Sequence, residues 1–107
     1  MTPSPYIYPG LAYIPSDLEQ LLNRVAKAAN LNVAELRSTS RRRHIIVAKQ
    51  VFCYYARNNT RHSYSQIGEC LGRYDHSTVI HCVKTVNNMI NDPLIRDLLK
   101  KVEKINF

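Results

Sequence analysis

The sequence predicts an all-α fold of about five to six helices, and two observations support this prediction. Apolar residues recur three or four positions apart along most of the chain, which is the spacing of the buried face of a helix. No segment shows a sustained alternation of apolar and polar residues, the pattern typical of a strand. With 107 residues, the chain has room for one domain with a modest hydrophobic core.

The first fifteen residues differ in composition from the rest of the chain. They contain four of the five prolines and three of the seven tyrosines. Proline fixes φ and lacks an N–H donor, so a regular helix or central strand is excluded here. We therefore expect residues 1–15 to form an extended Pro/Tyr-rich arm and residues 16–107 to form the folded domain.

Capping signals place the first three helices of this domain. Ser16 and Glu19 have the spacing of a capping box, so a helix is expected from residue 16 to about residue 30. Asn32 is the expected cap of a single helical turn. A long, largely buried helix is predicted from about residue 42 to residue 58. Its predicted inner face consists of Ile45, Ala48, Val51, Phe52 and Tyr55.

The next segment has the layout of a helix-turn-helix. Ser63 and Gln66 form a second capping signature before a short helix. Gly72 follows where a helix end needs a residue in the left-handed conformation. Asp75 then caps the predicted recognition helix, which is the second helix of such an element. The apolar stripe predicted for this helix consists of Val79, Val83, Val86 and Ile90.

A last helix is expected after Asp92, because Pro93 ends the preceding helix and is tolerated at the first position of a new one. Apolar residues recur at helical spacing through this segment. The predicted core residues of the last helix are Leu94, Leu98, Leu99, Val102 and Ile105.

Positive charge is concentrated in the middle of the chain. The formal net charge is +7. Between residues 37 and 84, nine basic residues accompany two acidic ones, whereas the remainder carries six of each. Localised basicity of this kind favours a polyanionic partner such as nucleic acid, although a solvated basic surface remains the alternative.

The sequence gives no sign of a secreted, membrane-spanning, metal-binding or catalytic protein. No signal peptide or apolar run of membrane-spanning length is present. Cys53, Cys70 and Cys82 lie in apolar helical patterns, which predicts free thiols in a reducing, cytoplasmic environment. No C-x-x-C or H-x-x-x-H spacing occurs, so neither a metal nor another cofactor is expected. His81 adjoins Cys82 without an evident orienting group, so no enzyme activity is expected.

Polar side chains occupy the face of the recognition helix opposite its apolar stripe. They are hydrogen-bonding or cationic groups of the kind that reach base edges in the major groove of DNA. The N-terminus of such a helix also favours a nearby phosphate. The polar positions are His76, Ser77, Thr78, His81, Lys84 and Asn88.

Basic residues outside the recognition helix are predicted to contact the DNA backbone. Lys49, Arg57 and Arg61 are expected to bind phosphates, which fixes register without reading sequence. A run of three arginines is expected in the adjacent minor groove, where narrow geometry favours this side chain. These arginines are Arg41, Arg42 and Arg43.

Several of these candidate residues also have interpretations that involve no contact with DNA. Asp75 is a helix cap under either interpretation, and capping alone would account for it. His76 and His81 are equally interpretable as surface histidines without a function. The arginine run is also compatible with a solvated hinge.

Three stretches between residues 38 and 86 resemble the C-terminal DNA-binding domain of the bacterial replication initiator DnaA. Residues 72–82 read G-R-Y-D-H-S-T-V-I-H-C, where that family has roughly G-G-R-D-H-T-T-V-x-H-A. Residues 57–68 are similar to the family stretch K/R-E-L-T-x-x-S-L-x-E-I-G, and residues 49–51 to R-Q-I. The stretches have the order and spacing of the family, and a looser similarity extends from residue 16 to residue 89.

The resemblance implies a Trp-repressor-like helix-turn-helix that binds an asymmetric DnaA box as a monomer. It assigns base-reading positions to Asp75, His76, Ser77, Thr78 and His81. It also implies a phosphate contact for Arg57, a minor-groove contact for Arg41, and DNA-facing positions for Lys49 and Gln50.

The chain departs from the family pattern at the turn before the recognition helix. Tyr74 replaces the arginine that precedes the Asp-His pair, and Arg73 stands where the family has the second glycine. This exchange is expected either to relocate one phosphate or guanine contact or to alter the preferred box. Ser77 in place of threonine lacks a methyl group that would meet thymine. No Walker A loop is present, so DNA binding is expected without ATP-dependent initiation.

The expected function is therefore that of a double-stranded DNA-binding protein that recognises DnaA-box-like sites. It would regulate transcription or replication initiation without ATPase activity. The alternative is a protein-interaction module in which the N-terminal arm and the last helix bind a protein partner. In that case DNA binding is weak or non-specific, and loss of salt dependence would distinguish the two.

Overall fold

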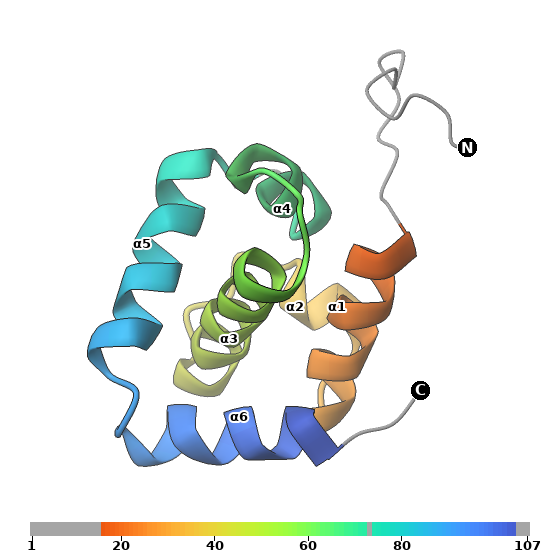
Figure 1. The fold of residues 1–107 in the computed structure, drawn as a ribbon. Helices are drawn as coiled ribbons and strands as arrows, with labels where there is room; N and C mark the ends of the chain where they lie inside the picture. The colour runs from red at the N-terminus through yellow and green to blue at the C-terminus, as the bar shows by residue number, and fades with distance from the viewer. Residues whose placement is uncertain (1–15, 73, 105–107) are drawn as a thin grey trace.

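The structure, a computed structural model, describes residues 16–72 and 74–104. Six helices and no strand occur in this part of the chain, so the predicted all-α helix-turn-helix fold is confirmed (Figure 1). No described helix has the length and apolar character needed to cross a membrane. The helices are α1 (Ser16–Ala28), α2 (Val33–Leu36), α3 (Arg43–Asn59), α4 (Tyr64–Cys70), α5 (His76–Asn88) and α6 (Pro93–Lys104).

Helix α3 is the centre of the fold, and α1, α4, α5 and α6 surround it (Figure 1). Its side chains Val51, Phe52 and Ala56 have no exposed surface. Full burial of a side chain such as Phe52 contributes roughly 1.5–3 kcal/mol. The predicted long buried helix is therefore confirmed, and every other long helix is positioned by contact with it.

Side chains on α1 and α3 hold α6 through its backbone carbonyls. Arg24 Nε donates to the carbonyl oxygen of Val102 at 2.8 Å. The Tyr55 hydroxyl donates to the carbonyl oxygen of Leu99 at 3.1 Å. The carbonyls of the last four residues of a helix lack intrahelical partners, so the bond to Val102 satisfies an acceptor that would otherwise need water. The end of α6 is thus fixed to the side of the core formed by α1.

The two internal capping boxes occur as predicted. The Asn32 side chain accepts from the Glu35 backbone N–H at 2.8 Å, and the Glu35 carboxylate accepts in return. Ser63 and Gln66 make the same reciprocal pair at the start of α4. The predictions for the arm of residues 1–15, for the side chain of Ser16 and for Ile105 concern parts of the chain that the structure does not describe.

The predicted core residues at the α5–α6 junction are corrected by the structure. Ile90 and Leu94 were expected inside, but they are 38% and 48% exposed. Ile90 lies beyond the end of α5, so it does not continue the stripe of that helix. On α6 the buried face passes through Ile95, Leu98 and Val102, and Leu94, in the first turn, lies at the edge of that face and is exposed.

Glycine permits the close approach of α4 and the turn before α5. A Cβ on Gly68 would collide with the carbonyl oxygen of Tyr74. The Gly68 carbonyl accepts instead from the Tyr74 backbone N–H at 3.0 Å. Gly72 has φ of +111°, in the region that favours glycine, as the sequence predicted. These two glycines set the angle at which the chain enters the recognition helix.

Candidate nucleic-acid interface

The N-terminus of α5 is capped by the side chain of Asp75. Its Oδ1 accepts from the backbone N–H of Thr78 at 2.9 Å, so the predicted cap is confirmed. This hydrogen bond is the main cause of a pKa below the usual range of an aspartate. The group is fully exposed and therefore presents a negative charge at the helix tip at neutral pH.

Helix α5 buries one face and presents the other to solvent. Val79, Val83 and Val86 are buried against the core, which holds the helix rigidly. The side chains predicted to read bases all lie on the exposed side, and Lys84 extends the same side by one turn. The exposed residues predicted to read bases are Asp75, His76, Ser77, Thr78 and His81.

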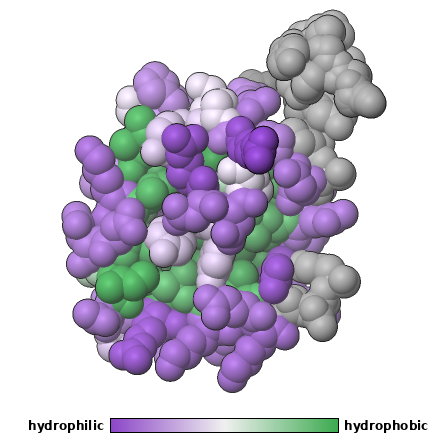
Figure 2. Space-filling view, in the orientation of Figure 1, coloured by the Kyte–Doolittle hydropathy of each residue, from purple (hydrophilic) through white to green (hydrophobic). Residues whose placement is uncertain are grey.

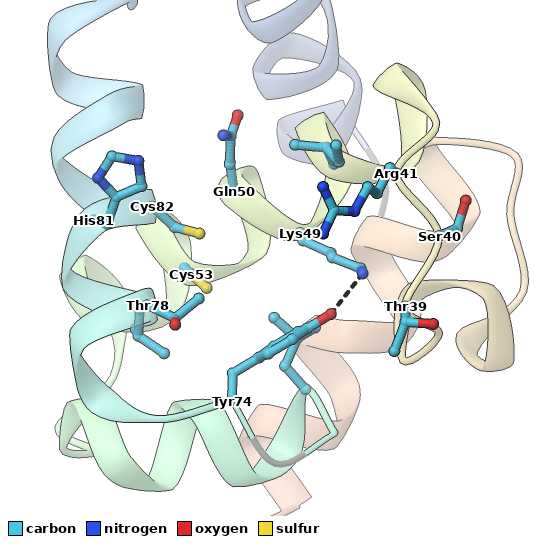
Figure 3. A pocket seen from close by; sticks show the side chains of 13 residues that line it. Thr39, Ser40, Arg41, Lys49, Gln50, Cys53, Tyr74, Thr78, His81 and Cys82 are labelled. Atoms are coloured by element: carbon cyan, nitrogen blue, oxygen red, sulfur yellow. Dashed lines mark hydrogen bonds between the residues drawn. The ribbon is translucent and has the colours of Figure 1, made fainter.

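A pocket of about 470 Å³ lies where α5, α3 and the segment before α3 meet (Figure 3). Thr78 and His81 line it from α5, Gln50 lines it from α3, and Arg41 lines it from the preceding segment. These residues are up to forty positions apart in sequence, yet the fold gathers them around one hollow. The predicted major-groove and minor-groove elements are therefore neighbours.

Lys49 is placed differently from the other basic candidates, because its side chain is only 7% exposed. Its Nζ donates to the Tyr74 hydroxyl at 2.6 Å (Figure 3). It also donates to the carbonyl oxygen of Ser38. The Tyr74 hydroxyl in turn donates to the Ser38 carbonyl at 3.2 Å. The ammonium thus joins the α4–α5 turn to the segment that carries Arg41. We name Lys49, Tyr74 and Ser38 the lysine clasp.

The lysine clasp was not foreseen from the sequence. Ser38 and Tyr74 are separated by thirty-six residues, and their contact depends on the packed fold. The available signal was the tyrosine at a position where the resembling family has arginine. A phenol accepts a hydrogen bond from an ammonium, whereas a guanidinium cannot. The substitution therefore creates a partner for Lys49 inside the fold.

Among the other cations predicted to contact the DNA backbone, those that the structure describes are exposed, and two of them contact another side chain. The Arg57 guanidinium lies 4.3 Å from the ring centroid of Tyr64, which is a cation–π arrangement. The guanidinium of Arg43 pairs with Asp92 at 3.3 Å, on the side of the α5–α6 turn. Arg41, Arg42 and Arg61 are exposed. Arg73 lies outside the described residues.

The three cysteines are free thiols. Within residues 16–72 and 74–104, no group of three or more His, Cys, Asp or Glu side chains is arranged to hold a metal ion. Cys53 and Cys82 both line the pocket, a proximity that the sequence did not indicate.

Comparison with known proteins matches the same segment. A family model described as the bacterial dnaA protein helix-turn-helix matches residues 18–86. The chain is 39% identical over 82 residues to the chromosomal replication initiator protein DnaA of Streptococcus thermophilus, covering 77% of this chain and 18% of that protein. It is 36% identical over 88 residues to the DnaA of Geotalea daltonii, covering 81% and 20%.

A third relative, the DnaA of Geobacter metallireducens, is 40% identical over 74 residues, which cover 69% of this chain and 16% of that protein. The chain thus spans about a fifth of the length of these relatives. The matched residues contain α2, α3, α4, most of α5, and the whole turn between α4 and α5. On this match and on the observed fold, the chain belongs to the DNA-binding helix-turn-helix family of bacterial DnaA.

Proposed function

We propose that this protein recognises DnaA-box-like sites in double-stranded DNA, with α5 in the major groove. One observation carries the proposal. The exposed face of α5 presents His76, Ser77, Thr78 and His81 beside the pocket that Arg41 and Gln50 also line. Hydroxyl and imidazole groups on a rigid helix are suited to base edges, and the nearby arginine is suited to an adjacent minor groove.

The side chains divide into two roles under this proposal. Asp75, His76, Ser77, Thr78 and His81 read bases, which gives specificity. The exposed cations bind the sugar-phosphate backbone without reading sequence. Lys49 contributes indirectly, by fixing the α4–α5 turn through the lysine clasp, because its ammonium is already bonded to protein acceptors. The residues proposed to contact a phosphate or the minor groove are Arg41, Arg42, Arg43, Gln50, Arg57, Arg61, Arg73 and Lys84.

At the level of the cell, we propose a cytoplasmic regulator that acts on transcription or on replication initiation by occupying such sites. The relatives are named as chromosomal replication initiators, and the match covers only their helix-turn-helix segment. We propose that residues 16–107 form one DNA-binding domain, that it binds as a monomer, and that it has no ATPase activity.

The test is a competition experiment by fluorescence anisotropy at physiological salt. A labelled duplex with a TTATNCACA-type box is bound by the protein, and unlabelled box or scrambled duplex is added. Preferential displacement by the box supports the proposal. Equal displacement by both duplexes contradicts sequence-specific recognition.

Two variants separate the proposed roles. His76→Ala should weaken binding to the box by roughly 1–3 kcal/mol and leave scrambled DNA unaffected, because it removes a base contact. Arg57→Glu should weaken binding to both duplexes, because it removes a phosphate contact. Lys100→Glu on α6 is the matched charge control and should leave both affinities nearly unchanged. If His76→Ala weakens both duplexes equally, its base-reading role is wrong.

A protein-interaction module is the second candidate, and one observation favours it. Met89, Ile90 and Leu94 are exposed together at the α5–α6 corner. Figure 2 shows apolar surface toward the C-terminal end of α5, within a mostly hydrophilic face. Exposed apolar side chains that adjoin one another mark many protein contacts. If the protein does not prefer the box, and its affinity for DNA does not fall as the salt concentration is raised, the protein-interaction module becomes the better supported candidate.

A further inference from the structure

Cys53 on α3 and Cys82 on α5 face each other across the contact between these two helices (Figure 3). The two thiols are close enough for each to shift the pKa of the other. Cys53 is fully buried and Cys82 is half-buried, and both line the pocket beside Thr78 and His81. Two free thiols in contact, with an opening to solvent, are the starting point for disulfide chemistry.

The two thiols are chemically unequal. The pKa of Cys53 is raised well above its usual value, first by the hydrogen bond with Cys82 and then by burial. The pKa of Cys82 is lowered, first by the hydrogen bond from Cys53 and further by the positive charge of Lys49, although its burial opposes this. The lysine clasp holds that ammonium at the pocket. Cys82 is half-buried whereas Cys53 has no exposed surface, so Cys82 is the thiol that an oxidant in solvent can reach first.

We propose that Cys53 and Cys82 form a reversible redox pair that a hydroperoxide converts into a disulfide bond between α3 and α5. Disulfides of cytosolic proteins are usually transient and redox-sensing, which suits a pair of this kind. Cys70 provides the contrast, because burial raises the pKa of its thiol to about 11 and it does not line the pocket.

The oxidation takes place in two balanced steps. The Cys82 thiolate attacks the terminal oxygen of the hydroperoxide, so that an S–O bond forms and the O–O bond breaks. The leaving alkoxide or hydroxide takes a proton from solvent, and Cys82 becomes a sulfenic acid. The Cys53 thiol then attacks the Cys82 sulfur, an S–S bond forms, and hydroxide leaves with the thiol proton as water. The two sulfurs together lose two electrons, which the O–O bond accepts.

The disulfide changes the surface that the proposed function uses, and this step rests on that function. An S–S bond is about 2.05 Å long, much shorter than the separation of two sulfur atoms that are in contact but not bonded. Closing it draws α5 toward α3 at the position next to His81. We therefore expect oxidation to weaken binding to the box by about tenfold, the effect of losing one base contact.

Tryptic mapping tests the disulfide directly, because each cysteine lies on its own peptide. Cys53 falls in residues 50–57, Cys70 in residues 62–73 and Cys82 in residues 74–84. The full chain is treated with hydrogen peroxide, alkylated, digested and examined by mass spectrometry. We expect peptides 50–57 and 74–84 to be cross-linked and peptide 62–73 to be alkylated. A cross-link that includes peptide 62–73, or no cross-link, overturns the proposal.

Two variants and a control assign the roles within the pair. Cys82→Ser should leave Cys53 fully alkylatable after peroxide, whereas Cys53→Ala should stop Cys82 at the sulfenic acid, detectable with dimedone. Cys70→Ala should oxidise like the original chain. Circular dichroism confirms that each variant is folded. If Cys53 oxidises equally fast in Cys82→Ser, the assignment of the reactive thiol is overturned.

The DNA measurement is made separately on reduced and oxidised protein. We expect the oxidised chain to bind the box about tenfold more weakly, with recovery after dithiothreitol and no change in Cys82→Ser. A confirmed disulfide with unchanged affinity overturns the effect on DNA binding. Reduced protein that does not prefer the box contradicts the proposed function, and the peptide map still decides the disulfide.

Discussion

At the scale of single residues, Asp75 combines a structural role with a proposed functional one. Its carboxylate accepts from the start of α5, and no other side chain caps that helix in the described residues. The cap is strongest when the carboxylate is ionised, because a negative charge is favourable at a helix N-terminus. Protonation of one exposed side chain therefore affects the stability of the whole recognition helix.

We predict a pH dependence of stability that depends on Asp75. Its pKa is lowered in the folded chain, so its contribution is fully present above the unfolded value of about 3.9. The contribution is lost as the pH falls through the lower folded pKa. Melting temperatures of the original chain and of Asp75→Asn, measured between neutral pH and strong acid, should therefore converge in acid. A difference that does not change with pH would contradict this prediction.

The lysine clasp gives a second prediction at this scale. Tyr74→Phe removes a hydrogen-bond partner from a buried ammonium, which should cost about 1–3 kcal/mol of unfolding free energy. The measurement is urea denaturation followed by circular dichroism. Tyr54→Phe is the matched control, because the Tyr54 ring packs against Tyr55 and its hydroxyl has no partner in the described residues. If both substitutions lowered the free energy of unfolding equally, the lysine clasp would not contribute to stability.

Residues that act on near neighbours were predictable from the sequence, and residues that act across the fold were not. Asn32, Ser63 and Asp75 cap helices through bonds to residues three positions away, so the pattern contains both partners. The clasp between Lys49 and Tyr74 and the thiol pair at the pocket depend on how α3 meets its neighbours. The sequence pattern does not encode such contacts locally.

At the scale of elements, α6 shows the limit of prediction from periodicity. A helical period restricts the buried face to a stripe, but neighbouring positions on that stripe are hard to distinguish. Leu94 was expected inside and lies outside, whereas Ile95 is 1% exposed. Both residues lie in the first turn of α6, four and three positions before the buried Leu98, so helical spacing alone allows either of them on the core face.

Adjacent substitutions on α6 test this assignment. Ile95→Ala should lower the free energy of unfolding by about 2–5 kcal/mol, because it leaves a cavity in the core. Leu94→Ala should change it by less than about 0.5 kcal/mol, because that side chain is already in contact with solvent. Urea denaturation of both variants measures the difference. A larger loss for Leu94→Ala than for Ile95→Ala would contradict the observed placement of α6.

At the scale of the whole molecule, the distribution of charged residues follows the arrangement of the helices around α3. The chain carries a net charge of +7, and its excess of basic residues lies between residues 37 and 84. These residues belong to α3, α4, α5 and their connections. Outside residues 37–84 six basic residues accompany six acidic ones, and most of these charges lie on α1 and α6, which pack against α3. The order of helices and this division were both evident from the sequence.

The charge distribution predicts a steep salt dependence of DNA binding. Five exposed cations near α5, if each neutralises one phosphate, give a slope of about −4.5 for the logarithm of affinity against the logarithm of salt. Anisotropy titrations at several salt concentrations measure the slope. A slope near zero would contradict phosphate contacts. The five cations are Arg41, Arg42, Arg57, Arg61 and Lys84.

The start of α1 and the end of α6 lie on the side of the molecule opposite α5 (Figure 1). The bond from Arg24 to the Val102 carbonyl holds these two helices together there. A bulky group joined at either helix end would therefore sit behind the core and leave the proposed DNA-binding face clear. This geometry makes the domain a ready component for fusion, since a fluorescent protein or a surface anchor can be attached at either end without covering α5.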